Sequence, residues 1–335
     1  LGPAGVIRAG ADLVLPRRRL PADVSVRDLI AGRFGRQVAD RLVDPLVGGI
    51  HASSIDRLSA EVTVPQILQV ARRSRSLMRG LRQLPSGPGP AEAIFATPRQ
   101  GLGHMVERLE ARLSAGGVRF EPLEVERVER SGGLWSVGPG REVVDAVVLA
   151  TPAPVTAALL GPSAPAGLAD ARYSSVALAL IACDGLELPP GYNGFLVPRS
   201  SGLLMTACSF ASAKWPHWTR PGRALLRMSA GRSADDRFRS LSDERLVEVL
   251  AGELSRILRS SVAPDQWRVH RWPDAFPRYE VGHLGRVGAV REALALSHPG
   301  VVVCGSSYDG AGIPACIWSG RQNARRLVEA VRQAA

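Results

Sequence analysis

The segment with the clearest chemical potential is a short apolar stretch that runs through glycines toward a helix. It covers residues 301–314 and reads Val-Val-Val-Cys-Gly-Ser-Ser-Tyr-Asp-Gly-Ala-Gly-Ile-Pro. A strand that turns into a helix, with Pro314 in the first helical turn, exposes backbone N–H groups and the positive end of the helix dipole. Such a place attracts anionic oxygen, and glycine lets a phosphate or a planar ring approach the backbone. The spacing is not G-x-G-x-x-G, so a strand-to-helix turn without a ligand stays open as an alternative.

Other residue types that commonly do chemistry are dispersed along the chain. No histidine pair has the H-x-x-x-H spacing, and no cysteine pair has the C-x-x-C spacing. Ser209 and Ser306 lack the G-x-S-x-G context of a hydrolase nucleophile. We therefore expect no metal site, no disulfide framework and no catalytic side chain, and the cysteine usage fits a reducing cytoplasm.

Several helices are expected around this segment. Ser25 is a predicted N-cap, with Asp28 completing an approximate capping box. Apolar periodicity predicts further helices over residues 67–81, 101–115, 243–258 and 313–331. Arginines at positions 72, 75, 79 and 82 form a stripe on the helix expected at 67–81, for which a solvated face is the main interpretation and a membrane or partner contact the alternative. Residues 85–90 should break regular structure, because they are rich in proline and glycine.

The strands fall into two groups. Short strands are expected at residues 118–120, 123–128, 134–137 and 143–149, which read as a meander and a return strand. Residues 174–229 hold β-branched and small apolar runs, which favour an antiparallel sheet. Another buried strand is expected at residues 301–304.

Composition limits the function classes. The 335 residues suggest about two domains at roughly 150 residues each. The formal charge is +11, but Lys214 is the only lysine and the arginines are scattered, so nucleic-acid binding is not expected. No apolar run approaches the roughly 18 residues of a spanning helix.

A set of segments, in order along the chain, resembles one family. The segments are Asp-Pro-Leu-Val-Gly-Gly-Ile at 44–50, Gly-Leu-Gly at 101–103, Gly-Phe-Leu-Val-Pro at 194–198, Lys-Trp-Pro-His at 214–217, Pro-Arg-Tyr-Glu-Val-Gly-His at 277–283, and residues 305–321. Together they resemble the oxygen-dependent, FAD-containing protoporphyrinogen and coproporphyrinogen III oxidases, within the monoamine-oxidase-like flavoproteins. The segments at 194 and 214 are most similar to enzymes of Gram-positive bacteria, which are associated with coproporphyrinogen III.

The resemblance implies a function in haem biosynthesis. FAD would accept a hydride from coproporphyrinogen III, and molecular oxygen would reoxidise it, so that coproporphyrin III forms over successive turns. Protoporphyrinogen IX is the alternative substrate. Arginines would receive the propionates, but the sequence singles out none of them.

Specific residues follow from the same resemblance. Gly305, Ser306, Ala311, Gly312 and Ile313 match the flavin-contacting loop. Val125 matches a valine whose backbone holds the adenine, and Trp272 is a further flavin neighbour for which a core tryptophan is the alternative. Gly194 and Leu196 match positions near the porphyrinogen pocket.

The resemblance also implies an α/β fold with an α+β substrate part. We expect a Rossmann-like FAD domain at residues 91–155 and 275–335, a substrate domain of antiparallel sheet and helix at 156–274, and a helical membrane- or substrate-side region at 1–90. Family members open with a G-x-G-x-x-G turn, which is not found near Leu1, so the FAD domain is expected to be truncated at its N-terminus. An exposed sheet edge and low stability should follow.

Partners and location are expected on the same basis. The implied small molecules are a porphyrinogen and O2. A cytoplasmic location is expected, with peripheral membrane contact, a homodimer and a complementing N-terminal segment left open.

Two further functions stay open. One is a different flavoprotein of the superfamily, such as an amine oxidase or a carotenoid desaturase, although few Tyr and Phe residues are available for an aromatic cage. The other is a non-catalytic fragment that binds porphyrin or a partner. This hypothesis is based on the missing dinucleotide-binding turn.

Overall fold

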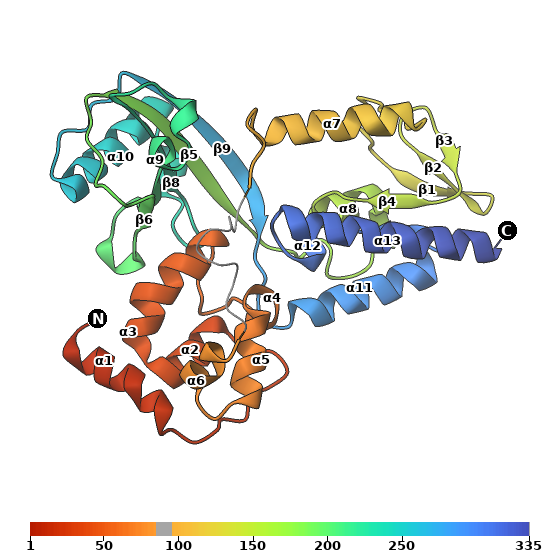
Figure 1. Cartoon of the computed structure of the whole chain (residues 1–335). Coiled ribbons are helices and arrows are strands. Elements are labelled where there is room, and N and C mark those ends of the chain that lie inside the picture. The colour runs from red at the N-terminus through yellow and green to blue at the C-terminus, as the bar shows by residue number, and fades with distance from the viewer. Residues whose placement is uncertain (85–95, 335) are drawn as a thin grey trace.

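The computed structural model describes residues 1–84 and 96–334. The chain forms three regions (Figure 1). They are the N-terminal helices, an antiparallel sheet with a helix on one face, and a region of helices around short strands. Each region has its own hydrophobic cluster. The mixed helix-and-sheet architecture confirms the expected α/β class. The domain boundaries given above stay a prediction, as does the expected break at residues 85–90, which lies outside the described residues.

The N-terminal region consists of short helices. They are α1 (Pro3–Gly10), α2 (Val26–Phe34), α3 (Arg36–Val38), the π-helix η2 (Ala39–Gly48), α4 (Ala60–Thr63), α5 (Pro65–Arg73) and α6 (Leu77–Arg82). Ser25 caps α2 as expected, because its hydroxyl oxygen accepts a hydrogen bond from the Asp28 backbone N–H at 3.0 Å. Val26, Leu29 and Leu77 lie in the buried core of this region.

The expected helix over residues 67–81 is wrong in one respect. The chain leaves the helical conformation at Ser74, and Ser76 then caps α6 by accepting a hydrogen bond from Arg79 N–H. The arginine stripe is thereby divided between two helices. Arg72 donates to the carbonyl of Pro21 at 3.1 Å, so part of the stripe ties down the N-terminal loop.

The region around the glycine-rich segment combines helices and short strands. Its elements are α7 (Leu102–Ala115), β1 (Val128–Ser131), β2 (Leu134–Val137), β3 (Glu142–Val144), β4 (Val147–Leu149), α8 (Ala153–Leu160), α11 (His283–Ser297), β10 (Val301–Val303), α12 (Ser306–Asp309) and α13 (Ile313–Ala334). Strands β1, β2 and β3 form an antiparallel meander, and β10 pairs in parallel with β4. Among the described residues, β4 is the only partner of β10, so β10 has an open edge.

Three strand predictions need correction. Residues 118–120 form no strand, and only Val128 of the expected strand 123–128 is in β1. The expected strand 143–149 is two strands, because the chain bends at residues 145 and 146 and pairs first with β2 and then with β10. Apolar residues alone could not show which partner each short segment finds.

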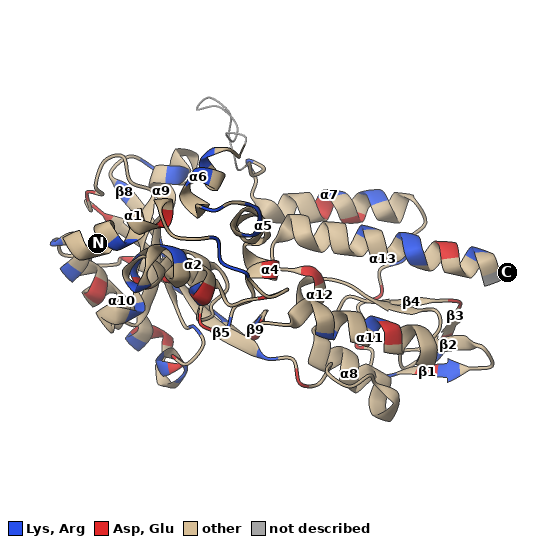
Figure 2. Ribbon diagram, turned by 90° about the horizontal axis from the view of Figure 1, so that it is seen from below, with Lys and Arg blue, Asp and Glu red and all other residues tan. Residues whose placement is uncertain are grey.

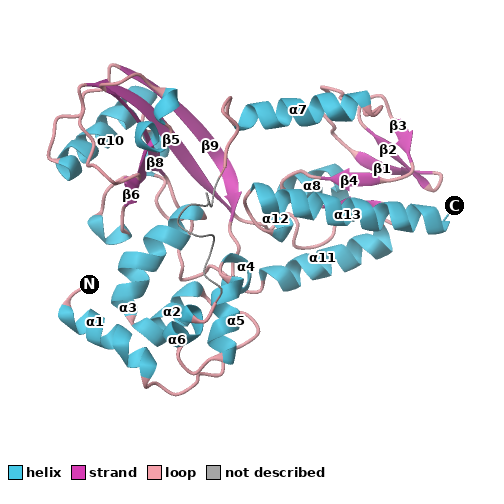
Figure 3. Ribbon diagram, viewed as in Figure 1, coloured by secondary structure: helices cyan, strands magenta, loops and turns pink. Residues whose placement is uncertain are grey.

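The antiparallel sheet lies in the middle of the chain. Its strands are β5 (Tyr173–Asp184), β6 (Gly194–Leu196), β7 (Met205–Phe210), β8 (Arg223–Ala230) and β9 (Gln266–Pro277), in the order β6-β7-β8-β5-β9. Helix α9 (Ala211–Lys214) and the short 3₁₀ helix η5 (Pro216–Trp218) connect β7 to β8. Helix α10 (Asp243–Leu258) covers one face (Figure 3). Ala179, Ile181 and Leu226 pack on that face against Leu250 of α10.

Strand β9 and helix α11 are absent from the expectations above. Strand β9 carries Arg268, His270 and Trp272 at alternate positions and two prolines, a pattern that is not apolar enough to indicate a strand. It is nevertheless the edge partner of β5 over most of its length.

Charges are mixed over the molecule. Figure 2 shows basic and acidic residues interspersed along the ribbon. Some pairs join regions: Arg199, next to the sheet, contacts the buried Asp44 of η2 at 3.1 Å. No helix in the described ranges is both long and apolar enough to cross a membrane.

Candidate functional site

The turn between β10 and α13 is built as the sequence predicts. Val301 and Val303 are buried, and the chain then passes through Gly305 at φ +106°, Gly310 at φ +117° and Gly312 at φ +103°. These backbone angles favour glycine, which lacks a Cβ. The stretch is not a pure loop, since Ser306–Asp309 form the single turn α12. The turn ends at the N-terminus of α13, where Pro314 is the second residue of the helix.

The five predicted loop residues lie in this one turn. Gly305 and Ser306 are half-buried, whereas Ala311, Gly312 and Ile313 are exposed. A Cβ built on Gly312 would meet no atom within 4 Å, so space is open beside its backbone. The outer part of the turn can therefore accept a group close to the main chain at the positive end of a 22-residue helix.

Buried side chains fix the inner part of the turn. The Ser319 hydroxyl accepts a hydrogen bond from Gly305 N–H at 2.8 Å and donates one to the Asp309 carboxylate. Asp309 also contacts Arg291 of α11 at 2.7 Å. The turn is thus tied to both α13 and α11, which pre-organises its outer backbone groups.

Two tyrosines support the turn from other parts of the chain. The Tyr279 hydroxyl donates to the carbonyl oxygen of Ser306 at 2.5 Å, and the Tyr173 hydroxyl lies 2.7 Å from the Ser307 hydroxyl. Burial raises the pKa of Tyr279 well above its usual value, so its hydroxyl stays protonated and serves as a donor. Neither tyrosine is among the site residues predicted from the sequence.

A third tyrosine belongs to the turn itself. The Tyr308 hydroxyl shares a hydrogen bond of 2.9 Å with Thr156, and its carbonyl oxygen lies 3.0 Å from His283 Nε2. Burial raises the pKa of Tyr308 to about 12 and lowers the pKa of His283, so both side chains are neutral near pH 7. They hold the turn in place and are not poised for acid–base chemistry.

Val125 and Trp272 lie in different surroundings. Val125 is half-buried and packs against the cluster that also contains Val301 and Val303 of β10. Trp272 is 41% exposed on β9 and stacks on His270 with ring centroids 5.7 Å apart, so it is not a core tryptophan. The roles expected of both residues in flavin contact stay predictions.

Gly194 and Leu196 lie on strand β6, next to a shallow cavity of about 300 Å³. A Cβ on Gly194 would lie 2.2 Å from the carbonyl oxygen of Cys208 on β7, which accounts structurally for the glycine. The cavity is also lined by Lys214 and Arg227. Their role near a substrate stays a prediction, but the sheet brings both residues next to cationic side chains.

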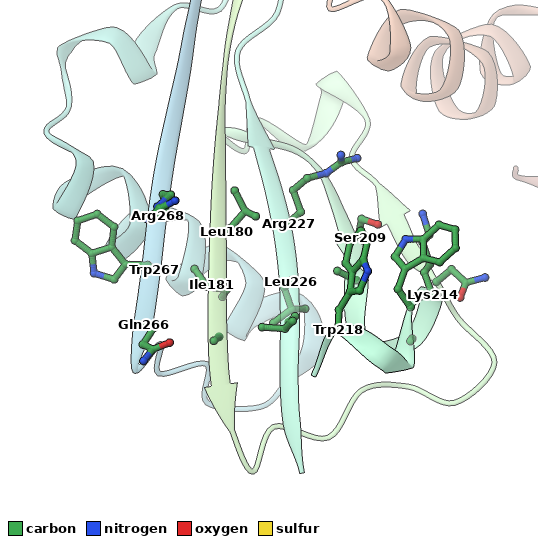
Figure 4. Close-up of a pocket in the computed structure, with 16 residues that line it drawn as sticks. Leu180, Ile181, Ser209, Lys214, Trp218, Leu226, Arg227, Gln266, Trp267 and Arg268 are labelled. Atoms are coloured by element: carbon green, nitrogen blue, oxygen red, sulfur yellow. The ribbon is translucent and has the colours of Figure 1, made fainter. Parts of the chain in front are cut away.

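A larger cavity of about 880 Å³ adjoins the first one. It lies between the sheet face that α10 leaves uncovered and the segment from α9 to η5 (Figure 4). Trp215 and Trp218 stack on each other in this segment, with ring centroids 5.6 Å apart. The lining is mostly apolar, and its cations are Lys214, Arg227 and Arg268. Such a cavity suits a large, flat, anionic molecule.

None of these three cations is among the site residues predicted from the sequence. Arg227 lies at an exposed position in the regular alternation of β8, and Arg268 lies on β9, which the sequence did not indicate as a strand. A charged residue at an outward position resembles any other surface residue until the strand order shows which side chains share its face.

Residues 1–84 and 96–334 contain no candidate metal site and no candidate catalytic cysteine. No group of three or more His, Cys, Asp or Glu side chains is placed to hold an ion there. Cys183, Cys208 and Cys304 are buried, and burial raises the pKa of Cys208 to about 12. A cysteine nucleophile is not supported by these environments.

Comparison with known proteins decides the family. The model of the flavin containing amine oxidoreductases matches residues 7–328, nearly the whole chain. The chain belongs to this family. A coproporphyrinogen III oxidase of Bacillus subtilis is 32% identical over 330 residues, covering 95% of this chain and 70% of that protein. A coproporphyrinogen III oxidase of Mycobacterium tuberculosis is 33% identical over 319 residues, covering 92% and 68%.

A solved structure gives the same answer for the fold. The crystal structure from Exiguobacterium sp. 255-15, with a provisional protoporphyrinogen oxidase assignment, superposes with a TM-score of 0.85 at 29% identity, covering 98% of this chain and 73% of that one. The family is flavin-containing, and the glycine turn at the start of α13 offers the open backbone groups that a flavin nucleotide needs.

Proposed function

We propose that this chain is an FAD-dependent coproporphyrinogen III oxidase of haem biosynthesis, which forms coproporphyrin III with O2 as the electron acceptor. The observation that carries the proposal is the cavity of about 880 Å³ over the uncovered sheet face, with its apolar and cationic lining. Relatives named for this activity support it across most of the chain. The substrate class fits because a porphyrinogen is a large apolar macrocycle with carboxylates at its periphery.

Residues 305–313 would hold part of the FAD. The open backbone beside Gly312 and the N-terminus of α13 would bind anionic oxygens, while Ser319 and Tyr279 keep the turn rigid. Val125 would lie at the adenine and Trp272 near the flavin ring. FAD, when bound, supplies a hydride acceptor that O2 regenerates.

The chain's own side chains would orient the substrate and exclude water. In each turn the porphyrinogen loses a hydride and a proton, and O2 takes up two electrons and two protons to become hydrogen peroxide. The neutral Tyr279, Tyr308 and His283 would hold the turn in position and would not themselves exchange a proton with the substrate. The apolar sheet face would seat the macrocycle, and Gly194 and Leu196 would lie at its rim.

The same lining argues against two other substrate classes. A protonated amine would be repelled by Lys214, Arg227 and Arg268, and an uncharged polyene would gain nothing from them. Protoporphyrinogen IX also carries carboxylates, so it remains the second candidate substrate, supported by the Exiguobacterium structure.

The decisive experiment has two steps. The purified chain is first titrated with FAD while the flavin absorption bands are followed, and a saturable shift is expected. Oxygen consumption and porphyrin fluorescence are then measured with coproporphyrinogen III and, separately, with protoporphyrinogen IX. Faster turnover of coproporphyrinogen III is expected. Flavin binding without turnover of either substrate would overturn the proposal, and porphyrin binding without flavin binding would favour a non-catalytic porphyrin-binding role.

We further propose contacts beyond the small molecules. Val6 and Ile7 of α1 are 57% and 76% exposed beside Arg8, which supports peripheral contact with an anionic membrane surface. The apolar side of α7, where Leu109 and Leu113 are exposed, supports a complementing segment or a second copy as partner. Co-sedimentation with vesicles of anionic lipid and a measurement of molar mass in solution test the two ideas.

A further inference from the structure

One row of side chains crosses the whole antiparallel sheet. Gly194 pairs with Ser209, Ser209 with Arg227, Arg227 with Leu180, and Leu180 with Arg268, so the row runs from β6 to β9. Figure 4 shows Arg227, Leu180 and Arg268 at one level on three neighbouring strands.

This row faces away from α10. Along the three central strands, β7, β8 and β5, the neighbours of the row residues belong to the core that α10 covers, for example Ala179 and Ile181 on either side of Leu180. Side chains alternate between the faces of a sheet, so the row lies on the uncovered face. Leu180 is 42% exposed there, which leaves the two arginines with an apolar side chain between them.

The arginines of the row have no counter-charge among the residues that the structure describes. With about 4.8 Å between strands, their Cα atoms are about 10 Å apart. Neither Arg227 nor Arg268 forms an ion pair or a side-chain hydrogen bond with any described residue, and the same holds for Lys214. By contrast Arg223, also on β8, contacts both Asp184 and Asp265, at 2.8 and 2.6 Å. The carboxylates at this end of the sheet therefore pair with Arg223 and not with Arg227 or Arg268.

The same face becomes aromatic toward the end of β9 that leads to the glycine turn. His270 and Trp272 follow Arg268 at alternate positions, and Tyr279, just beyond β9, contacts Ser306 in the turn. Trp272 lies four residues from Arg268, about 13 Å along the strand. A macrocycle seated over His270 and Trp272 would extend its far edge toward the cations.

We propose that Arg227 and Arg268, with Lys214 opposite them across the cavity, form a carboxylate-binding row for the propionates farthest from the flavin. This inference rests on the proposed function and explains which substrate the site would prefer. Arginine binds carboxylate by charge-assisted, often bidentate hydrogen bonds. Coproporphyrinogen III carries a propionate on every ring, whereas protoporphyrinogen IX carries vinyl groups in place of some of them. The row therefore favours coproporphyrinogen, because a vinyl group leaves a cation of the row unpaired.

The test uses product binding, which needs no turnover. Coproporphyrin III and protoporphyrin IX are titrated into the full chain with FAD present, and porphyrin fluorescence is followed for the parent, Arg227→Gln, Arg268→Gln and the double variant. Each single change is expected to weaken coproporphyrin binding about tenfold, with a smaller effect on protoporphyrin. The double variant should lose its preference between the two. Arg227→Lys should fall between, since it keeps the charge without the planar fork.

Arg256→Gln is the matched control, because Arg256 is an exposed arginine of α10 on the opposite side of the sheet. It should bind both porphyrins like the parent, and the thermal unfolding of all variants should match, since the side chains changed are exposed.

The outcomes separate this row from the proposed function. One outcome is that the parent oxidises coproporphyrinogen while the arginine variants bind coproporphyrin as tightly as the parent. That result would overturn the proposed role of the row and leave the proposed function in place. If binding depends on the row but the parent with FAD does not turn over, the function is overturned and the row stands. Equal weakening toward both porphyrins, or no binding of either by the parent, overturns the row.

Discussion

The Tyr279 hydroxyl donates a hydrogen bond of 2.5 Å to the carbonyl oxygen of Ser306. Tyr279 is fully buried and belongs to the hydrophobic cluster of the N-terminal helices, whereas Ser306 lies in the glycine turn that precedes α13. The contact therefore links the packing of the first helices to the geometry of the candidate flavin site.

Removing this hydroxyl tests the link. We expect Tyr279→Phe to lower the free energy of unfolding by about 0.5–1.5 kcal/mol, because the half-buried carbonyl of Ser306 loses its donor, and to weaken FAD binding. Chemical denaturation and FAD titration measure the two effects. Tyr192→Phe is the control, since Tyr192 is 65% exposed. Unchanged FAD affinity in Tyr279→Phe would show that the turn does not depend on this contact.

Alkylation of a cysteine near the turn tests FAD binding without an activity assay. Cys316 lies in the first turn of α13 and is only half-buried, while the other three cysteines are buried. We expect iodoacetamide to modify Cys316 first and FAD to slow that reaction by covering the turn. Mass spectrometry of the labelled peptides measures it, and Cys316→Ser should remove the fast phase. Equal labelling with and without FAD would contradict a cofactor at residues 311–313.

Acid should destabilise the protein through His283. Burial lowers the pKa of this imidazole in the folded state, so below about pH 6.5 the unfolded chain binds the proton more readily. The free energy of unfolding therefore falls as the pH falls through the unfolded pKa and continues to fall toward the lower folded value. Thermal unfolding from pH 7.5 to 5.5 measures it.

The variant His283→Gln isolates the contribution of this one group. Its stability should depend less steeply on pH than that of the parent, with a difference below about 1.4 kcal/mol per pH unit, the limit for one proton. Equal slopes for the parent and His283→Gln would contradict this explanation.

Gly194 should tolerate no side chain. Its φ is +137°, and an added Cβ would lie 2.2 Å from the Cys208 carbonyl oxygen, so Gly194→Ala must push β6 away from β7. Gly202→Ala is the control, because Gly202 also has a positive φ of +70° but open space around it. We expect Gly194→Ala to cost about 1–3 kcal/mol more than Gly202→Ala in urea unfolding. A similar cost for both would mean that β6 shifts freely.

Local signals in the sequence predicted several elements well. The N-cap at Ser25, the helix expected over residues 101–115 and the turn from β10 into α13 depend on residues close in the chain. Caps, glycine conformations and helical periodicity are local properties, and these predictions were confirmed. The single helix expected over residues 67–81 failed for the same kind of reason, because Ser76 is a second cap that the apolar pattern masked.

The sequence by itself determined the glycine turn and, through ordered motifs, the family. Only the tertiary structure decided which side chains meet at the site. Leu180 stands between Arg227 and Arg268 because β8 and β9 both pair with β5, although they are distant in the chain, and a shift of one residue in either pairing would turn its arginine to the other face. The contact of Tyr279 with Ser306 likewise depends on packing between separate regions. Such placements result from strand order and register, which the types of neighbouring residues do not specify.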